Sequence, residues 1–472
     1  MGSYLRIGAV ASIAIFAFLA HGQELNNPSD KYLRVPLPAE WEADSHFAMT
    51  LPTDDAWWKS FGDATLDSLI SEGENNNFDV RVAMRRMEIA RQAVSRAKSG
   101  YYPTVEFNGG WTKSRTSGAM TEHSAPASTM SYWDLGLNAS WQIDVFGKIT
   151  SQVKQSKAAW HASRAQHAAA MVTMAAQIAT TYFQLRTYQA EKAVTEEQIK
   201  SQAEVVKIVE ARYETGLASK LDLSQARTVY YSSVATLPEL ELSIGTSINA
   251  LAVLTGTTPE AMRIRLSSPA GMPDYRQVVA VRVPMELLRR RPDIAEAEYT
   301  LAGYAAALGI AKKEFLPVLS ISGSIGTQAH RGSDLFKNNS FTYSIAPVLS
   351  WTLFDGFARK AALAEARETM MEGIESYNLT VSTAVEEVDN AMLSYTEALN
   401  HIAALEQVRN QSAESFKLSL DLYKGGLEGF YNVVDAQLNL INYSNSLVAS
   451  HGAALAALVN LYEALGGGWT NQ

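Results

Sequence analysis

The chain contains the same pattern twice, and this repeat limits its possible folds more than any other feature of the sequence. Four blocks recur in the same order, at offsets of 214 or 210 residues. The matching pairs are Asp79-Val80 and Asp293-Ile294; Ala97-Lys98 with Pro103 and Ala311-Lys312 with Pro317; Ser140-Trp141 and Ser350-Trp351; and Tyr213, Gly216, Leu217 and Ala226 with Tyr423, Gly426, Leu427 and Ala436. This ordered recurrence predicts two copies of one large structural unit.

Each repeat contains one very long helical segment. Residues 148–215 contain no glycine or proline, and residues 357–424 contain only Gly373. Apolar residues in both segments follow helical spacing, and a helix of this length measures about 100 Å. Alanine is abundant, which lets helices approach closely, so we expect tightly packed helical hairpins. Three glycines are expected to end the long helices and form the hairpin turns: Gly216, Gly425 and Gly426.

Two strand-like segments precede each long helix. Residues 133–143 and 341–351 alternate apolar residues with mostly small or polar ones, and shorter partners precede them. The alternation predicts strands near residues 101–112, 132–145, 316–327 and 341–354, joined in pairs by polar loops at 113–131 and 328–340. A soluble sheet with one wet face shows the same alternation. Strands of about ten residues with aromatic residues at both ends favour membrane-spanning strands instead.

The first residues predict export from the cytoplasm. An uncharged apolar run follows Arg6, and small residues come after it, so we interpret residues 1–22 as a signal peptide; the alternative is a short buried helix. No later window approaches 18 uncharged apolar residues, so no inner-membrane helix is expected. The sequence has no cysteine, so neither disulfides nor a lipid-modified cysteine is expected.

These features divide the chain into a signal peptide (1–22), an extended N-terminal segment (23–56), a first repeat (57–256), a linking equatorial segment (257–284) and a second repeat (285–472). Four strands cannot close a barrel, and unpaired backbone groups in lipid cost several kcal/mol each. Three chains would supply twelve strands and an open lumen. The predicted fold class is an α+β membrane protein: a trimeric 12-stranded transmembrane β-barrel, four strands per protomer, continued by a long α-helical periplasmic barrel.

One block also resembles a known family. The segment from Val283-Pro284 to Glu296, with Arg290, Arg291, Pro292 and Asp293 at its centre, resembles the hallmark of the TolC-like outer-membrane efflux factors, in their drug-efflux and nodulation-protein branch. Further matches are Trp57-Trp58 with Phe61-Gly62-Asp63, Val434-Asp435-Ala436-Gln437, and the ending Leu465-Gly466-Gly467-Gly468-Trp469. The resemblance implies a homotrimer that works with a periplasmic membrane-fusion adaptor and an inner-membrane transporter of the proton-driven multidrug type or the ABC type. Many relatives carry a lipidated N-terminal cysteine, which this sequence lacks.

The resemblance also implies a periplasmic gate at the hairpin tips. The family's gate positions correspond to Asp222, Tyr423, Glu428 and Asp435, although some relatives have an arginine where Glu428 stands. Simpler roles remain open for each residue. Ser219 and Asp222 have capping-box spacing. Asp435 fits a solvated helix face, Glu428 a turn, and Tyr423 a packed groove.

The sequence predicts a channel and no enzyme. It has no His-Glu-x-x-His motif, phosphate-binding loop or nucleophile elbow, so no catalytic residue, metal site or cofactor is expected. The Arg289–Arg291 run invites a nucleic-acid interpretation, but in a chain of net charge −9 a structural pairing with carboxylates is favoured. We expect an outer-membrane exit channel, extending into the periplasm, that conducts small molecules such as drugs for a tripartite efflux pump. The alternatives are an exit duct for type I protein or peptide secretion and a non-conducting periplasmic coiled-coil scaffold.

Overall fold

The computed structural model describes residues 32–36, 47–48, 56–117, 127–274, 276, 279–281 and 290–467. The expected signal peptide, most of the expected N-terminal segment 23–56 and the final part of the linking segment 257–284 lie outside these ranges. The beginning of the family motif, from Val283 to Arg289, also lies outside these ranges. The same holds for Gly468 and Trp469 in the matching segment near the C-terminus.

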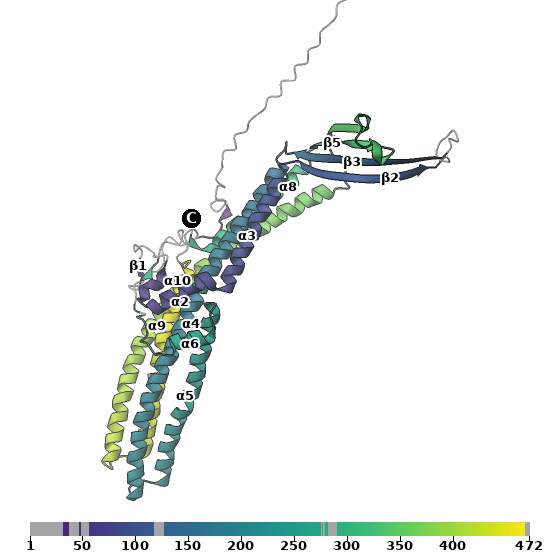
Figure 1. Ribbon diagram of the computed structural model, residues 1–472. Coiled ribbons are helices and arrows are strands. Elements are labelled where there is room, and N and C mark those ends of the chain that lie inside the picture. The colour runs from purple at the N-terminus through teal and green to yellow at the C-terminus, as the bar shows by residue number, and fades with distance from the viewer. Residues whose placement is uncertain are drawn as a thin grey trace, which may run out of the picture.

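The molecule is an elongated rod of helices with a sheet at one end and hairpin tips at the other (Figure 1). Both halves have the same order of elements: a helix of 22 residues, two strands, a helix of 67 residues and a helix of 35 residues. In the first half these helices are α3 (Phe78–Ser99), α4 (Lys148–Glu214) and α5 (Lys220–Leu254), and in the second α8 (Pro292–Lys313), α9 (Ala358–Lys424) and α10 (Phe430–Ala464). The structure therefore repeats as the sequence does.

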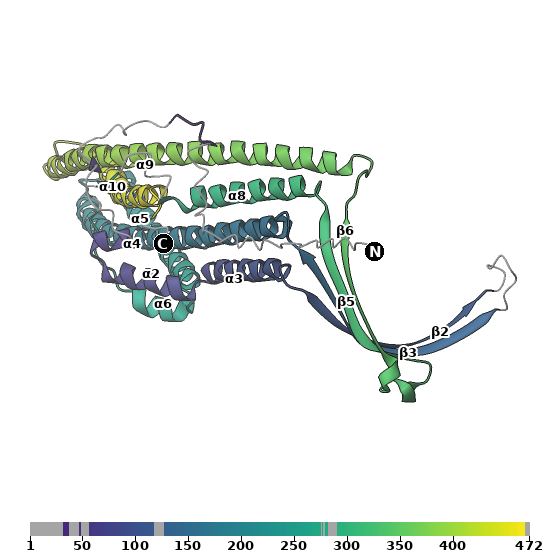
Figure 2. The ribbon, with the colours of Figure 1, turned by 90° about the horizontal axis from the view of Figure 1, so that it is seen from above.

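The strands form one antiparallel sheet in the order β2-β3-β5-β6 (Figure 2). Their bounds are β2 Thr104–Thr116, β3 Ser128–Ile143, β5 Val318–Ala329 and β6 Phe341–Ser350. The first hairpin is longer than the sequence suggested, because residues 113–116 and 128–131 pair as strands and not as a loop. Apolar alternation ends at Trp111, but backbone pairing does not require apolar side chains, so the pattern did not reveal this extension.

A mixed core joins the two halves near the middle of the rod. The short elements η1 (Trp57–Phe61), α2 (Ala64–Asn76) and α6 (Pro259–Leu266) pack there, and β1 (Phe47–Ala48) pairs in parallel with β4 (Val279–Ala280). Tyr182 of α4, Tyr395 of α9 and Leu458 of α10 are fully buried in this core. Their burial fixes α4, α9 and α10 relative to one another between the sheet and the tips.

By length and composition, α10 is the one described helix that is long and apolar enough to cross a membrane. It lies against α9 and α4 within the bundle (Figure 1). Its buried apolar residues, such as Leu455 and Leu458, therefore belong to helix packing.

Candidate functional site

One face of the sheet presents apolar side chains from all four strands. Phe107, Leu137, Ile325 and Tyr343 are paired in register and form one row across the sheet, and all four side chains are exposed. The helices meet the sheet at its end and leave this face open (Figure 2). Because a continuous apolar face is unfavourable in water, this face is suited to lipid.

Aromatic residues lie at both ends of the apolar face. At the loop end, the Trp111 and Trp133 rings lie 6.2 Å apart. At the helix end, the indole N–H of Trp141 donates to the Tyr101 carbonyl at 3.0 Å, and that of Trp351 donates to the Phe315 carbonyl at 3.0 Å. The two repeats thus anchor their tryptophans in the same way. Such belts are typical of the two interfaces of a membrane.

The opposite face of the sheet is polar. Its corresponding row consists of Glu106, Asn138, Ser324 and Ser344, and the two serine hydroxyls are 2.8 Å apart. Among the described residues of the strands, this face carries acids, Glu106 and Asp134, but no lysine or arginine. A wall of this kind can contact water and favours cations over anions.

The two hairpin tips have the same backbone turn. After α4, the Gly216 N–H donates to the Tyr213 carbonyl and the Leu217 N–H to the Arg212 carbonyl; Gly426 and Leu427 repeat both bonds after α9. Gly216 and Gly426 have φ values of 74° and 72°, a left-handed conformation that favours glycine. Gly425 has a right-handed conformation and occupies the place of Thr215 in the first repeat. The positive φ is therefore needed at the second glycine of the pair.

Two of the proposed gate residues make contacts within the tips. Asp222 forms a capping box with Ser219, in which each side chain accepts a bond from the backbone N–H of the other. Tyr423 is only 3% exposed, and its ring lies 5.1 Å from that of Phe430. Burial raises the pKa of Tyr423, and the nearby charge of Asp222 raises it further. Both residues thus have the simpler roles that the sequence left open, and these roles do not oppose a gate.

The other two gate candidates are exposed: Glu428 lies in the turn between α9 and α10, and Asp435 lies in the second turn of α10. Glu428 accepts a bond from the Asn432 amide at 2.8 Å, and Asp435 accepts one from Asn439 at 3.3 Å. Neither forms an ion pair with a described residue. Both carboxylates thus remain accessible to water and ions.

Sequence reasoning missed Arg212, which connects the two tips. Its guanidinium donates to the Lys424 carbonyl at 2.9 Å and lies 4.8 Å from the centre of the Tyr423 ring. A basic residue in the last turn of a helix is a common capping signal, but it does not show that the side chain crosses to another hairpin. Its counterpart in the second repeat is Leu422, so comparing the two repeats does not indicate a role for Arg212 either.

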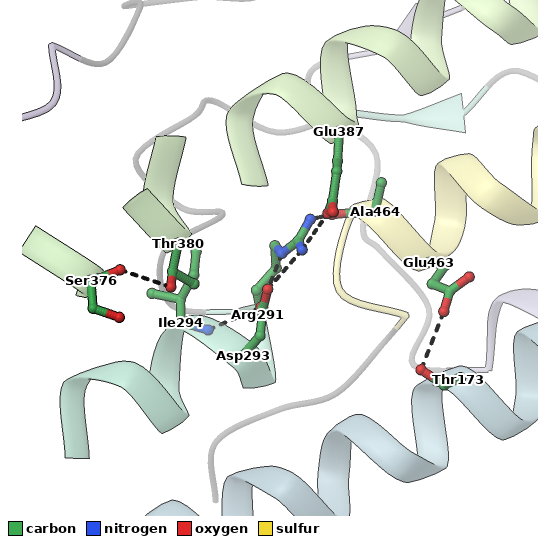
Figure 3. Close-up of polar contacts among 9 residues, drawn as sticks. All are labelled: Thr173, Arg291, Asp293, Ile294, Ser376, Thr380, Glu387, Glu463 and Ala464. Atoms are coloured by element: carbon green, nitrogen blue, oxygen red, sulfur yellow. Dashed lines mark hydrogen bonds and ion pairs between the residues drawn. The ribbon is translucent and has the colours of Figure 1, made fainter. Parts of the chain in front are cut away.

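Arg291 of the family motif connects three helices, α8, α9 and α10, near the start of α8 (Figure 3). The residue is 8% exposed, and its guanidinium contacts Asp293 at 2.8 Å, Glu387 at 2.5 Å and the Ala464 carbonyl at 3.0 Å. Pro292 begins α8 and is buried, and the Arg290 carbonyl faces Gly466, where a Cβ atom would lie at only 2.7 Å. The motif therefore clamps the end of α10 to α8 and α9. Its buried arginine supports a structural role and not one in nucleic-acid binding.

No group of three or more potential metal ligands occurs among the described residues.

Comparison with known proteins agrees with this geometry. The model of the "Outer membrane efflux protein" family matches residues 69–257 and 283–467. The chain is 27% identical to "Toluene efflux pump outer membrane protein TtgC" of Pseudomonas putida, over 98% of this chain and 96% of that protein. It is 26% identical to "Nodulation protein T" of Rhizobium leguminosarum bv. trifolii, over 92% of each. The solved structure of the outer-membrane channel OprN superimposes with a TM-score of 0.87 and 27% identity, covering 92% of this chain and 97% of that one.

These matches span nearly the whole chain and confirm the resemblance seen in the Arg290–Asp293 motif. The matched family consists of outer-membrane efflux channels and not of enzymes, and the bundle of this chain extends from that membrane into the periplasm. The duplicated architecture, the lipid-suited sheet and the family match lead to one conclusion: this chain belongs to the outer membrane efflux protein family.

Proposed function

We propose that three copies of this chain close a twelve-stranded barrel that passively conducts small molecules out of the cell. The observation that carries this proposal is the open sheet, whose edge strands β2 and β6 have no partner strand on their outer sides among the described residues. Unpaired edges are not tolerated in lipid, and a barrel removes them. With three chains, β6 of each pairs with β2 of the next.

The polar face of the sheet supports a water-filled passage. In a closed barrel the apolar row faces lipid, so the Glu106 row faces the lumen. Twelve strands leave a lumen too wide for these short serine and asparagine side chains to fill. Movement through it then needs no energy source within this chain.

We propose small apolar or amphiphilic molecules, including drugs, as the cargo. The support is the likeness to a protein named for toluene efflux. A channel of this kind receives its cargo from other proteins, so we also propose a periplasmic adaptor and an inner-membrane transporter as partners. The first repeat (57–256) and second repeat (285–472) then contribute equivalent parts of the wall in each protomer, each with two strands and one long helical hairpin.

The proposal is tested by reconstituting the purified protein in planar lipid bilayers and recording single channels. We expect discrete conductance, and drug accumulation in cells that lack their own exit channel should fall when this chain is expressed beside a compatible pump. A protein that inserts into the bilayer but gives no conductance would support a scaffold and contradict the channel.

We further propose that Asp222, Tyr423, Glu428 and Asp435 form the periplasmic gate, with Arg212 as an added connection. The support is their position at the two tips, which are joined by the Arg212–Lys424 contact and by a shared apolar cluster that includes Val209, Leu223, Tyr423, Phe430 and Val433. Three exposed Glu428 carboxylates around a three-fold axis would repel one another and attract cations.

The change Glu428→Gln tests this assignment, since it removes the charge with little change in shape. We expect lower selectivity for potassium over chloride in single-channel recordings. We also expect fewer openings, because the change removes the repulsion among the three carboxylates that disfavours the closed state. The change Glu214→Gln, at the other tip, is the matched control. Selectivity and opening that stay the same in Glu428→Gln would exclude Glu428 from the gate.

A further inference from the structure

Two basic side chains lie on the lipid-suited face, just beyond its outer aromatic belt. Lys113 and Arg115 have odd numbers in β2, as do Phe107 and Trp111, so they share a face with those residues. The paired residues on β3 are Ser131 and Thr129. The apolar face thus changes to a basic one within two residues of Trp111.

This basic segment extends beyond the four-stranded sheet. The last pair between β3 and β5 is Trp133 with Ala329, and beyond it β2 and β3 continue as a two-stranded ribbon (Figure 2). A strand rises about 3.4 Å per residue, and one tilted by about 45° gains about 2.4 Å of height per residue. Lys113 and Arg115 therefore lie about 5 and 10 Å above Trp111, within or at the edge of the headgroup layer.

No carboxylate among the described residues pairs with either side chain. The nearest acid on these strands, Asp134, points to the other face, because its carboxylate lies 3.4 Å from where a Cβ on Gly110 would stand. The loop after β5 adds a net positive charge. Gly332 lies over the Trp133 ring, and Arg331 precedes it. A hydrogen bond with Lys337 lowers the pKa of the nearby Asp334 carboxylate, and the charge of Arg331 also acts on this carboxylate and lowers its pKa further. Lys337 in the same loop already pairs with Asp334 at 2.7 Å.

We propose that Lys113 and Arg115 bind the phosphate groups of phosphorylated lipids in the outer leaflet, with Arg331 contributing to the same field. The charge is complementary, the height matches the headgroups, and the side chains face outward where lipid lies. Arginine forms paired bonds to phosphate, and lysine provides a mobile point charge. This inference rests on the sheet being the membrane-spanning part of the proposed channel, and it adds a lipid ligand to it.

The test measures how much lipid A stays bound to the folded protein. Wild-type protein and the Lys113→Gln/Arg115→Gln variant are incubated in mild detergent with bisphosphorylated lipid A, and bound lipid per chain is counted by native mass spectrometry. A charge near an anionic lipid surface contributes about a 5-fold change in binding, so we expect a loss of about 5- to 25-fold in the variant. Dephosphorylated lipid A should bind equally weakly to both.

The control is Arg263→Gln/Lys417→Gln, which removes the same charges from exposed helical positions outside the sheet. Equal retention of lipid A by wild type and the Lys113→Gln/Arg115→Gln variant would overturn the proposal. So would displacement of lipid A by millimolar inorganic phosphate, which would indicate a site for the free anion. Single-channel conductance of the variant is recorded in parallel: unchanged conductance with unchanged lipid retention refutes the lipid site alone, whereas absent conductance in wild type refutes the channel.

Discussion

Among single residues, Arg291 shows how a sequence motif acquires its meaning from distant partners. Its guanidinium joins Asp293, which is two residues away, to Glu387 and Ala464, which belong to other helices. The motif itself identified the residue and favoured pairing with acids. It could not identify Glu387 or the α10 carbonyl, because those contacts arise only when α9 and α10 fold back on α8.

We predict that Arg291→Met destabilises the protein by about 2 kcal/mol, because it leaves a helix-end carbonyl and a carboxylate without their donor. Arg291→Lys should reduce the stability less than Arg291→Met, since lysine keeps the positive charge although it lacks the paired N–H donors of the guanidinium. Thermal unfolding in detergent measures both. Arg265→Met is the control: it breaks a surface pair with Glu72 at 2.9 Å and should cost less than about 1 kcal/mol. Equal effects at both sites would contradict the clamp.

Glu463 provides a pH-dependent test beside this clamp. Burial raises the pKa of Glu463 above its ordinary value of 4.5; a hydrogen bond from Thr173 lowers it, the charge of Glu387 raises it, and Arg291 lowers it. Between pH 4.5 and the raised pKa, the folded protein holds the Glu463 proton more tightly than the unfolded chain does. The free energy of unfolding therefore falls as pH rises through this range.

We therefore predict that Glu463→Gln raises the unfolding temperature more at pH 8 than at pH 4.5. Glu204→Gln, on the exposed side of α4, controls for the loss of a charge. A gain from Glu463→Gln that is the same at both pH values would show that burial of the ionised carboxylate does not limit stability.

Among the secondary-structure elements, the long helices were predictable and the strand ends were not. Residues 148–215 contain no glycine or proline and carry apolar residues at helical spacing, which together predict one uninterrupted helix, and α4 occupies residues 148–214. By contrast, β2 continues to Thr116 through Lys113 and Arg115, where no apolar alternation remains to be read. Contacts between elements, such as Arg212 with Lys424, carry no local signal at all.

The paired turns allow a matched prediction within one tip. Gly426→Ala places a side chain at φ 72°, which costs about 1–2 kcal/mol, although no atom lies closer than 4.0 Å. Hydrogen exchange in the last turn of α9 should then accelerate about 5- to 30-fold if it occurs by local opening. Gly425→Ala, at a right-handed position where the nearest atom is 3.4 Å away, is the control. Faster exchange in Gly425→Ala than in Gly426→Ala would contradict the assigned turn.

For the whole molecule, the duplicated order of helices and strands could be predicted from the sequence. The place where the two halves pack against each other could not. Offsets of 214 and 210 residues foretold two equivalent halves, and the structure gives each half helices of 22, 67 and 35 residues. The central core, where Tyr182, Tyr395 and Leu458 meet, depends on residues whose apolar spacing looks the same as elsewhere in the helices. Packing between helices, and not local pattern, selects where the halves join.

The most direct test of the account is the number of chains in the folded membrane assembly, because four strands cannot seal a barrel alone. Native mass spectrometry of protein extracted from outer membranes in mild detergent measures this number. We predict a single species of three chains that keeps its strand structure. A species of one chain, with the four strands still folded, would contradict the proposed barrel and the passage through it.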